Sequence, residues 1–274
     1  MTDASFASKL DDSMRRNRSL LCVGLDPPQE LVDRLGFGSF ADYNAAIVEA
    51  THPFVCAYKP QFAHYAAVGR EADLETTIAA IHAHPCAVPV ILDAKRGDIG
   101  NTASQYAREA FERYRADAVT VNPYMGLDTL QPFVRHADRG VIVLVKTSNA
   151  GSSDFQDLEL RSGEPLYMAV ARAVAGLGAN VAFVVGATYP DQLHRLRGQF
   201  PDTLFLVPGI GAQGGDLAQV LAAGLDRRGR GVVINASRSI LQADDGKAGR
   251  ATYLAAVGQA ARTLRGEIVA CCPC

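Results

Sequence analysis

The chain alternates short apolar runs with longer amphipathic segments from about residue 20 to residue 264. Several apolar runs are continuous, which is typical of parallel strands covered on both faces. We therefore predict eight strands, at Leu20–Asp26, Phe54–Gln61, Pro89–Lys95, Ala118–Pro123, Gly140–Ser148, Val181–Thr188, Thr203–Gly211 and Gly231–Arg238. The segments between and after them predict eight helices, at Asp42–Ala50, Glu71–His84, Thr102–Arg115, Asp128–Ala137, Glu164–Gly178, Asp191–Phe200, Asp216–Ala223 and Lys247–Leu264.

Eight strand–helix units over roughly 250 residues predict an α/β fold of the (β/α)8 TIM-barrel type. A doubly wound open sheet is the alternative, but no G-x-G-x-x-G fingerprint follows the first strand. No linker or composition shift divides the chain. We expect one barrel domain over residues 1–274, with an N-terminal extension at 1–18 and a C-terminal tail at 266–274.

Composition narrows the range of partners. Hydrophobic residues make up 48% of the chain and the formal net charge is −2, so neither nucleic acid nor an acidic membrane surface is an expected partner. No apolar run approaches the roughly 20 residues needed to span a bilayer. The polar N-terminal segment, Met1–Arg18, does not resemble a secretory signal. We expect a cytoplasmic protein whose phosphate site, if it has one, is local.

The most informative stretch is Asp93–Asp98, which directly follows the apolar run Val88–Leu92. Side chains two residues apart on a strand share a face, so Asp93 and Lys95 are predicted to project together. Placing an acid and a base where a buried strand ends is costly unless they are paired or used. The stretch is therefore typical of a catalytic βα loop.

Other strand ends would add to this group. In a barrel the carboxyl ends converge on one mouth, which would bring Asp26, Lys59, Asp93 and Lys95 together. A stabilising ion network is the alternative, but buried ion pairs stabilise less well than apolar packing. We therefore favour chemistry at this mouth.

The last two predicted strands suggest a phosphate site. Pro208 and Gly209 open a glycine-rich turn that contains Gln213 and leads into a helix at Asp216, and glycines let backbone N–H groups approach an anion closely. Arg238 ends the eighth strand and carries a guanidinium fork suited to phosphate. Loops after strands seven and eight are the usual phosphate site in these barrels.

The fifth predicted strand ends in Lys146, Thr147 and Ser148, where a hydroxyl could contact a heterocycle. Lys146 shares a face with Ser148 by parity, and the sequence leaves open whether Lys146 or Thr147 reaches the mouth. Asn122 is interpreted as a turn residue rather than a ligand contact. The polar segment Asn149–Gly163 is either an active-site lid or a surface insertion.

Three further clusters are interpreted as structural rather than functional. His82, His84 and Cys86 have metal-like spacing but lie at a helix end, where the helix dipole favours histidine. The arginines of segment 224–231 fall on the opposite face of a barrel and are interpreted as a solvated loop. The cysteines at 271–274 lack the second half of a metal site and are interpreted as a frayed tail.

The segment Asp93–Thr102 closely resembles the signature of the orotidine 5′-phosphate decarboxylase family. Lys59 within Tyr58–Pro60, Asp26 within Gly24–Asp26, the segment Pro208–Gly215 and Arg238 also fit that family. The segments 92–98 and 120–124 resemble its bacterial type 2 branch. The resemblance covers the chain from the first predicted strand to the eighth.

The resemblance implies a homodimer with shared active sites that converts orotidine 5′-phosphate to UMP and CO2 without a metal or cofactor. It implies that Lys95 protonates C6, that Asp93 faces the departing carboxylate and that Lys59 holds both Asp93 and the ribose. The remaining roles implied by the resemblance are a cross-subunit position for Asp98, ribose contacts for Asp26 and Thr102, a pyrimidine contact for Ser148, and phosphate contacts for Pro208, Gly209, Gln213 and Arg238.

Two alternatives differ in chemistry. A Mg²⁺-dependent sugar-phosphate decarboxylase or aldolase shares the Asp-x-Lys-x-x-Asp element but would need a carboxylate where this chain has Lys59. A catalytically silent phosphate-binding barrel would need the glycine-rich turn and Arg238 but not Lys95.

Overall fold

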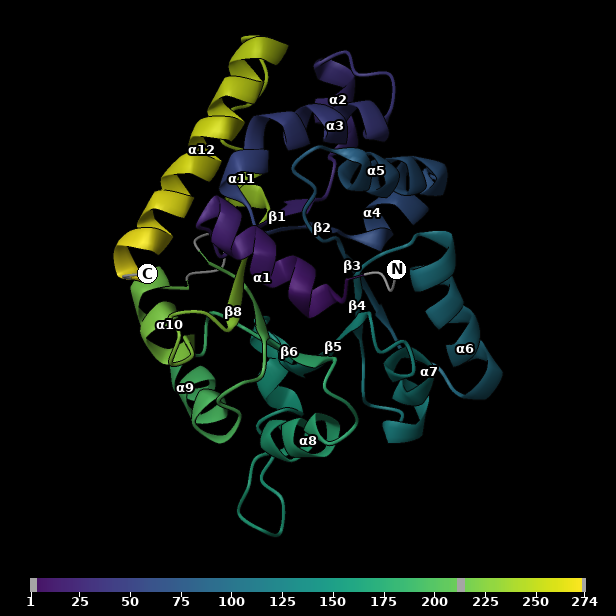
Figure 1. The fold of residues 1–274 in the computed structure, drawn as a ribbon, viewed down its shortest axis with the longest axis vertical. Helices are drawn as coiled ribbons and strands as arrows, with labels where there is room; N and C mark the ends of the chain where they lie inside the picture. Colours follow the sequence, from purple (N-terminus) through teal and green to yellow (C-terminus); the bar gives the residue numbers. More distant parts are fainter. Residues whose placement is uncertain (1–3, 211–214, 273–274) are drawn as a thin grey trace.

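The computed structural model describes residues 4–210 and 215–272. Eight parallel strands form one sheet in the order β2-β1-β8-β7-β6-β5-β4-β3. Two parallel bridges, Tyr58↔Val90 and Gln61↔Asp93, join β2 to β3, so the sheet closes into the (β/α)8 barrel that the sequence predicts (Figure 1). The strands are β1 (Leu21–Leu25), β2 (Ala57–Pro60), β3 (Ile91–Arg96), β4 (Ala118–Val121), β5 (Gly140–Lys146), β6 (Val181–Val185), β7 (Phe205–Pro208) and β8 (Val232–Ala236).

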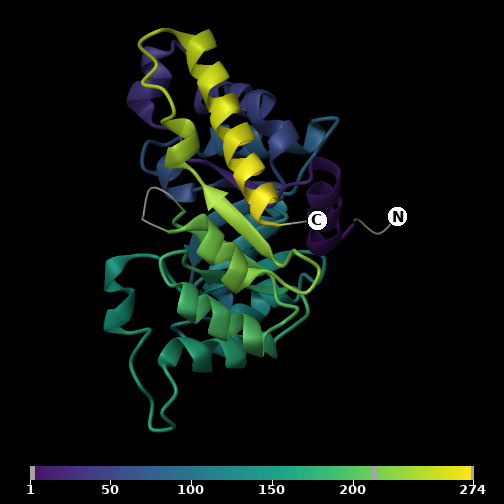
Figure 2. The same cartoon turned by 90° about the vertical axis from the view of Figure 1, so that its left-hand side faces the viewer.

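Helices cover the outside of the barrel, as the views in Figures 1 and 2 show. They are α1 (Phe6–Asn17), α2 (Gln29–Arg34), α3 (Phe40–Thr51), α4 (Phe62–Ala66), α5 (Glu71–Ala83), α6 (Gly100–Arg108), α7 (Gln131–Val134), α8 (Leu166–Ala175), α9 (Pro190–Gln199), α10 (Leu217–Gly224), α11 (Arg238–Leu241) and α12 (Arg250–Cys271). Shorter helical turns are η1 (His52–Phe54), η2 (Glu109–Arg113), η3 (Leu127–Leu130) and η4 (Ala150–Asp154). Every residue of β1, β2, β4 and β8 is buried, because side chains pack inside the barrel on one face and against helices on the other.

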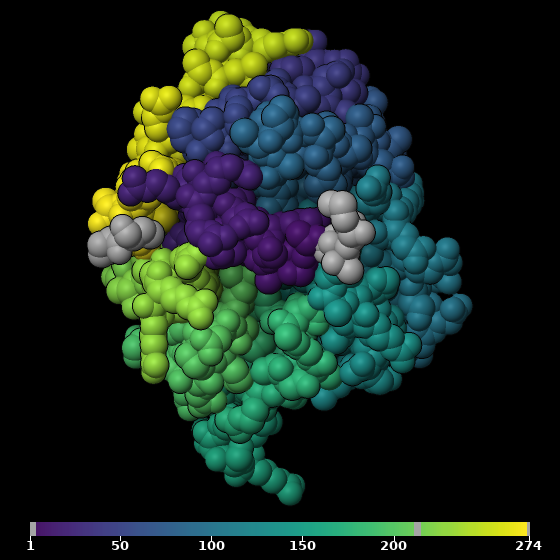
Figure 3. Space-filling view, in the orientation of Figure 1, coloured from purple at the N-terminus to yellow at the C-terminus, as the bar shows by residue number. Residues whose placement is uncertain are grey.

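The N-terminal segment forms a helix, which the predicted extension at residues 1–18 did not specify. Phe6, Leu10 and Met14 lie four residues apart on one face of α1 and are buried. The helix lies across the amino ends of the strands and covers the centre of the face seen in Figures 1 and 3. Lys9 of α1 donates to Asp117 at 2.8 Å. The apolar stripe is only one residue wide, so the polar residues around it obscure it in the sequence.

The C-terminal end also differs from the prediction of a tail at 266–274. Helix α12 continues to Cys271, and Ile268 and Cys272 are buried. Ile268 extends the buried face formed by Tyr253, Val257 and Ala261, so packing stabilises this last part of the helix. Cys274 lies outside the described residues.

Two predicted helices are interrupted. The segment predicted as a helix at 102–115 is α6 followed by the π-helical turn η2, and the segment at 128–137 is η3 followed by the four-residue helix α7. Pro132 at the start of α7 lacks an N–H, which favours a new start over a continuous helix. Within the described residues, we find no helix with the length and apolar character that crossing a membrane requires.

Candidate active site

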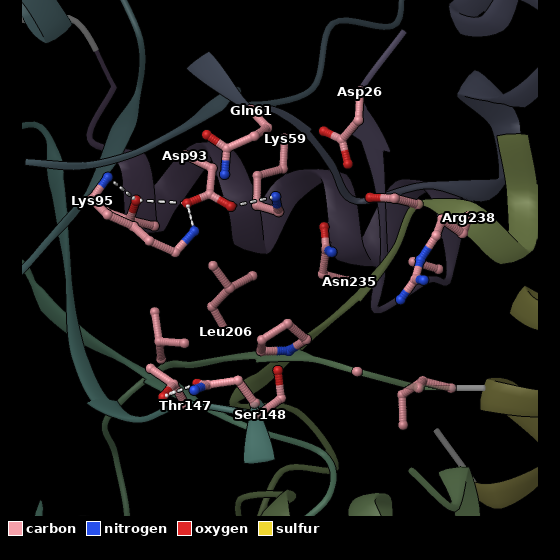
Figure 4. A pocket seen from close by; sticks show the side chains of 18 of the residues that line it. Asp26, Lys59, Gln61, Asp93, Lys95, Thr147, Ser148, Leu206, Asn235 and Arg238 are labelled. Atoms are coloured by element: carbon pink, nitrogen blue, oxygen red, sulfur yellow. Dashed lines mark hydrogen bonds and ion pairs between the residues drawn. The ribbon is translucent and has the colours of Figure 1, made fainter. Parts of the chain in front are cut away.

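The carboxyl ends of the strands surround a cavity of about 800 Å³. Eight of the predicted site residues line it: Asp26, Lys59, Asp93, Lys95, Ser148, Pro208, Gly209 and Arg238. Figure 4 labels all of these except Pro208 and Gly209. Two predicted residues, Asp98 and Thr102, do not line this cavity. Gln213 lies outside the described residues.

A row of alternating charges crosses one wall of the cavity. The Lys59 Nζ donates to Asp93 Oδ2 at 2.7 Å, and the Lys95 Nζ donates to Asp93 Oδ1 at 2.6 Å. The Lys59 side chain is 5% exposed and that of Asp93 is 10% exposed, whereas Lys95 is 47% exposed. Lys95 is therefore the more accessible of the two lysines in this row.

The two buried groups of the row favour their charged forms. Burial alone would lower the pKa of Lys59, but Asp93 and Asp26 outweigh burial and raise this pKa above its usual value. Burial alone would raise the pKa of Asp93, but Lys59 and Lys95 together hold this pKa well below its usual value. At neutral pH the buried pair is therefore held as the Lys59 ammonium group facing the Asp93 carboxylate.

A bulge brings Lys95 into this row. The register between β3 and β4 shifts between Leu92 and Arg96, and Lys95 has a left-handed φ of +47°. The Thr120 hydroxyl on β4 donates to Asp93 Oδ1 at 2.9 Å and accepts the backbone N–H groups of Ala94 and Lys95 at 3.1 and 2.9 Å. Strained backbone of this kind persists only where its surroundings fix it, and it is concentrated at functional sites.

Lys146 lies behind the cavity wall and does not line the cavity. Its ammonium group has no exposed surface, donates to Asp157 at 2.7 Å and to Ser152 at 3.1 Å, and lies 4.3 Å from the ring centre of Tyr189. The register of β5 against β6 shifts between Leu144 and Lys146, so parity along the strand does not hold here. Lys146 therefore anchors the loop that follows β5.

That loop supplies one side of the cavity. Ser152, Phe155 and Gln156 line the cavity, and the segment continues into a hairpin closed by the bridge Glu159↔Pro165. The hairpin projects from the body of the molecule, at the bottom of Figures 2 and 3. The first part of the segment thus contributes to the cavity wall, and its second part is a surface insertion.

The geometry favours Ser148 over Thr147 as the free hydroxyl of this wall. Thr147 donates to Asn149 at 2.7 Å and accepts from the Gln156 amide at 2.9 Å, so its hydroxyl is already engaged. A Cβ at Gly186 would lie 2.7 Å from the Ser148 Cα, so only glycine lets β6 end this close to Ser148.

The described residues at the two ends of the loop after β7 include two glycines that contact each other. Gly209 has a φ of +105°, and its carbonyl accepts the Gly215 N–H at 3.2 Å. Arg238 lines the same cavity as Pro208 and Gly209, and no carboxylate of the described residues forms an ion pair with it. A guanidinium in that position can bind phosphate in a forked geometry.

Several cavity residues were not assigned by sequence reasoning: Gln61, His64, Thr120, Phe155, Gln156 and Asn235. Gln61 could have been found, because it lies two residues beyond Lys59 and so shares its face. Thr120 and Asn235 lie within otherwise apolar strands and carry no such signal. Asn122 accepts the Tyr124 N–H at 3.0 Å, which confirms the predicted turn.

The histidines of the cluster far from the cavity have hydrogen-bond partners within the protein. His82 contacts Asp117 at 2.8 Å. His84 lies near Glu49 and His52, but its Nδ1 accepts the Cys86 N–H at 3.0 Å. In a neutral ring this places the proton on Nε2, the nitrogen that faces Glu49, so His84 is poorly prepared to bind a metal.

The barrel and its charged mouth define the class: a (β/α)8-barrel enzyme whose site is built at the carboxyl ends of the strands. The model of the orotidine 5′-phosphate decarboxylase / HUMPS family matches residues 19–252. The chain therefore belongs to this family. A curated orotidine 5′-phosphate decarboxylase of Cellvibrio japonicus is 50% identical over 251 residues, which cover 88% of this chain and 91% of that protein.

Two further comparisons extend the match to nearly the whole chain. The curated orotidine 5′-phosphate decarboxylase of Dechloromonas aromatica is 48% identical over 272 residues, covering 96% of this chain and 98% of that one. The solved structure of Leishmania donovani OMP decarboxylase has a TM-score of 0.83 at 40% identity, covering 98% of this chain and 100% of that one. The protein is a carboxy-lyase of this family.

Proposed function

We propose that this protein decarboxylates orotidine 5′-phosphate to UMP and CO2 in pyrimidine biosynthesis, without a metal or cofactor, and that Lys95 protonates C6. The observation that carries the proposal is the row Lys59–Asp93–Lys95, with contacts of 2.7 and 2.6 Å, at the mouth of the barrel. The names of the curated relatives support the choice of substrate.

The row suits a reaction that forms a carbanion. The bond between C6 and the substrate carboxylate breaks, CO2 leaves, and the electron pair stays on C6. The ammonium group of Lys95 stabilises this developing charge and then transfers a proton to C6. The neutral Lys95 amine regains a proton from water, which its 47% exposure permits.

Asp93 has two roles in the proposed reaction. Its carboxylate holds Lys95 in place and faces the position of the substrate carboxylate, so repulsion is relieved as CO2 departs. Lys59 keeps Asp93 ionised from the buried side. Thr120 completes the hydrogen bonds of Asp93 Oδ1.

The substrate extends from this row towards Arg238. The phosphate would lie against Arg238, Pro208 and Gly209, and Gln213 is proposed as a further phosphate contact. Ser148 would contact the pyrimidine, and Asp26 would accept from a ribose hydroxyl. Binding energy from the distant phosphate can then be used to lower the barrier at C6.

The Mg²⁺-dependent alternative fits the donor set poorly. Both Asp93 oxygens accept from ammonium groups, and Lys59 stands 2.7 Å from the carboxylate that a cation would need. A divalent ion there would be repelled by two positive charges.

We further propose a homodimer in which Asp98 and Thr102 serve the neighbouring site. Neither residue lines the cavity of its own chain, and the Asp98 carboxylate accepts from the N–H of Ile99. Exposed apolar side chains lie on the segments that follow β3 and β4: Ile99, Tyr124, Met125 and Leu127. Such a group next to a functional loop is typical of an interface.

The test is to add orotidine 5′-phosphate to the pure protein in EDTA and follow the ultraviolet absorbance of the orotate ring. The proposal predicts complete conversion to UMP at a rate that EDTA leaves unchanged. Turnover that requires added Mg²⁺ would favour the metal-dependent alternative.

A further inference from the structure

Two buried oxygen atoms of the cavity lack a hydrogen-bond partner within the described residues. They are Asp26 Oδ1, at the end of β1, and Asn235 Oδ1, on β8. Buried polar atoms are nearly always hydrogen-bonded, so an unpaired acceptor requires an explanation. A bound ligand that supplies the missing donor is one such explanation.

Asn235 occupies a central place in the cavity. The residue is 8% exposed, and the strand register sets it beside Pro208 of β7 and Cys22 of β1. Figure 4 shows its side chain between Asp26 and Lys59 on one side and Arg238 on another. It is therefore held on a rigid strand between the charged row and the proposed phosphate contact.

The position and the chemistry limit what the donor can be. A phosphate dianion offers no hydrogen-bond donor, and the pyrimidine is assigned to the charged row and Ser148. A ribose must lie between the base and the phosphate because it connects them covalently. It carries two hydroxyl donors on adjacent carbons, and the site offers two unpaired acceptors.

We propose that Asn235 contacts the substrate directly and, with Asp26, selects a sugar that carries both hydroxyls. The inference rests on the proposed function and deepens it, because it assigns the discrimination between ribose and deoxyribose nucleotides to a specific side chain. A site built to pair with a hydroxyl rejects an analogue that lacks it, because the buried acceptor is then left unpaired.

The experiment compares the wild type with Asn235→Leu, which keeps similar volume but has no polar atom. Each protein is assayed with orotidine 5′-phosphate and with its 2′-deoxy and 3′-deoxy forms. In the wild type we expect kcat/KM to fall about 10²-fold for at least one deoxy substrate. In Asn235→Leu we expect a similar loss with the ribose substrate and less than about threefold further loss with that deoxy substrate.

Equal losses for all three substrates in Asn235→Leu would overturn the inference, because they would indicate damage unrelated to a hydroxyl. Asn235→Ala serves as the second variant if Asn235→Leu does not fold. Calorimetric binding of UMP and its two deoxy forms to the same proteins gives a readout independent of turnover. A wild type that prefers UMP but does not decarboxylate would refute the proposed function and leave the role of Asn235 standing, whereas equal binding of all three nucleotides would refute the role of Asn235.

Discussion

The hydroxyl oxygen of Thr120 accepts the backbone N–H of Lys95 at 2.9 Å, at a residue whose φ is +47°. The same hydroxyl donates to Asp93. One side chain on β4 thus fixes both the strained backbone of β3 and the carboxylate that holds the Lys95 ammonium group. This relationship makes the position of the proposed proton donor depend on a neutral residue of the neighbouring strand.

Replacing Thr120 by Val keeps the shape but removes the hydroxyl. We expect kcat to fall about 10²-fold, since a displacement of roughly 1 Å at a reacting group has that effect, while UMP binding changes by less than about threefold. Thr120→Ser keeps the hydroxyl and should retain most of the activity. Steady-state kinetics and calorimetry check both; a Thr120→Val variant as active as Thr120→Ser would contradict the positioning role.

Lys146 is expected to stabilise the cavity wall formed by the loop after β5. Lys146→Met leaves the Asp157 carboxylate, 33% exposed, without its ion pair, and should lower the free energy of unfolding by about 1–3 kcal/mol. It should also raise KM more than it lowers kcat. The loop after β5 is expected to contribute to substrate binding rather than to the reaction at C6. Urea unfolding and steady-state kinetics measure these effects.

Lys247→Met is the matched control, because Lys247 pairs with Asp245 at 79% exposure. An exposed pair contributes little, so this variant should stay within about 0.5 kcal/mol of the wild type. Equal effects of the two substitutions would show that burial of Lys146 is unimportant.

The charged row should make stability depend on pH in a defined direction. The pKa of Asp93 is lower in the folded protein than in the unfolded chain, so its stabilising contribution is complete above about pH 4 and is lost as the pH falls further. Asp93→Asn should therefore cost about 3 kcal/mol at pH 7, since it leaves buried Lys59 unpaired. The difference from the wild type should narrow below pH 4.

The double variant Lys59→Met with Asp93→Asn removes both charges of the buried ion pair. It should be more stable at pH 7 than Asp93→Asn alone, because the uncompensated ammonium group is gone. Urea unfolding of the three proteins across pH decides this. A double variant less stable than the single one would argue against charge pairing as the cause.

Shared active sites predict complementation between inactive variants. Lys95→Ala and Asp98→Ala should each be nearly inactive alone, but mixed subunits should recover up to about a quarter of wild-type activity, because half of the dimers then contain one intact site. Lys95→Ala mixed with Lys59→Ala is the control, since both changes affect the same chain's contribution to the site. Recovery in neither mixture would remove the cross-subunit role of Asp98.

The sequence predicts the barrel and the charged row because both depend on local patterns. Continuous apolar runs such as Val88–Leu92 identify strands, and the charges that follow them identify the mouth. Neither register shift can be read from the sequence. Strand β3 gains two residues against β4 at the bulge that contains Lys95, and β5 gains one residue against β6 at Lys146, which reverses the face expected from parity. The roles of Thr120 and Asn235 could not be predicted from the sequence, because they depend on contacts with strands that are distant along the chain.

In the proposed reaction the Lys95 ammonium group stabilises the charge on C6 and protonates it. The most direct test of this role is single-turnover decarboxylation of orotidine 5′-phosphate by Lys95→Met in EDTA, with UMP binding measured on the same sample. We expect a rate at least about 10⁴-fold below that of the wild type, from the combined loss of charge stabilisation and proton transfer, with UMP affinity within about tenfold. A rate within tenfold of the wild type would contradict this role of Lys95.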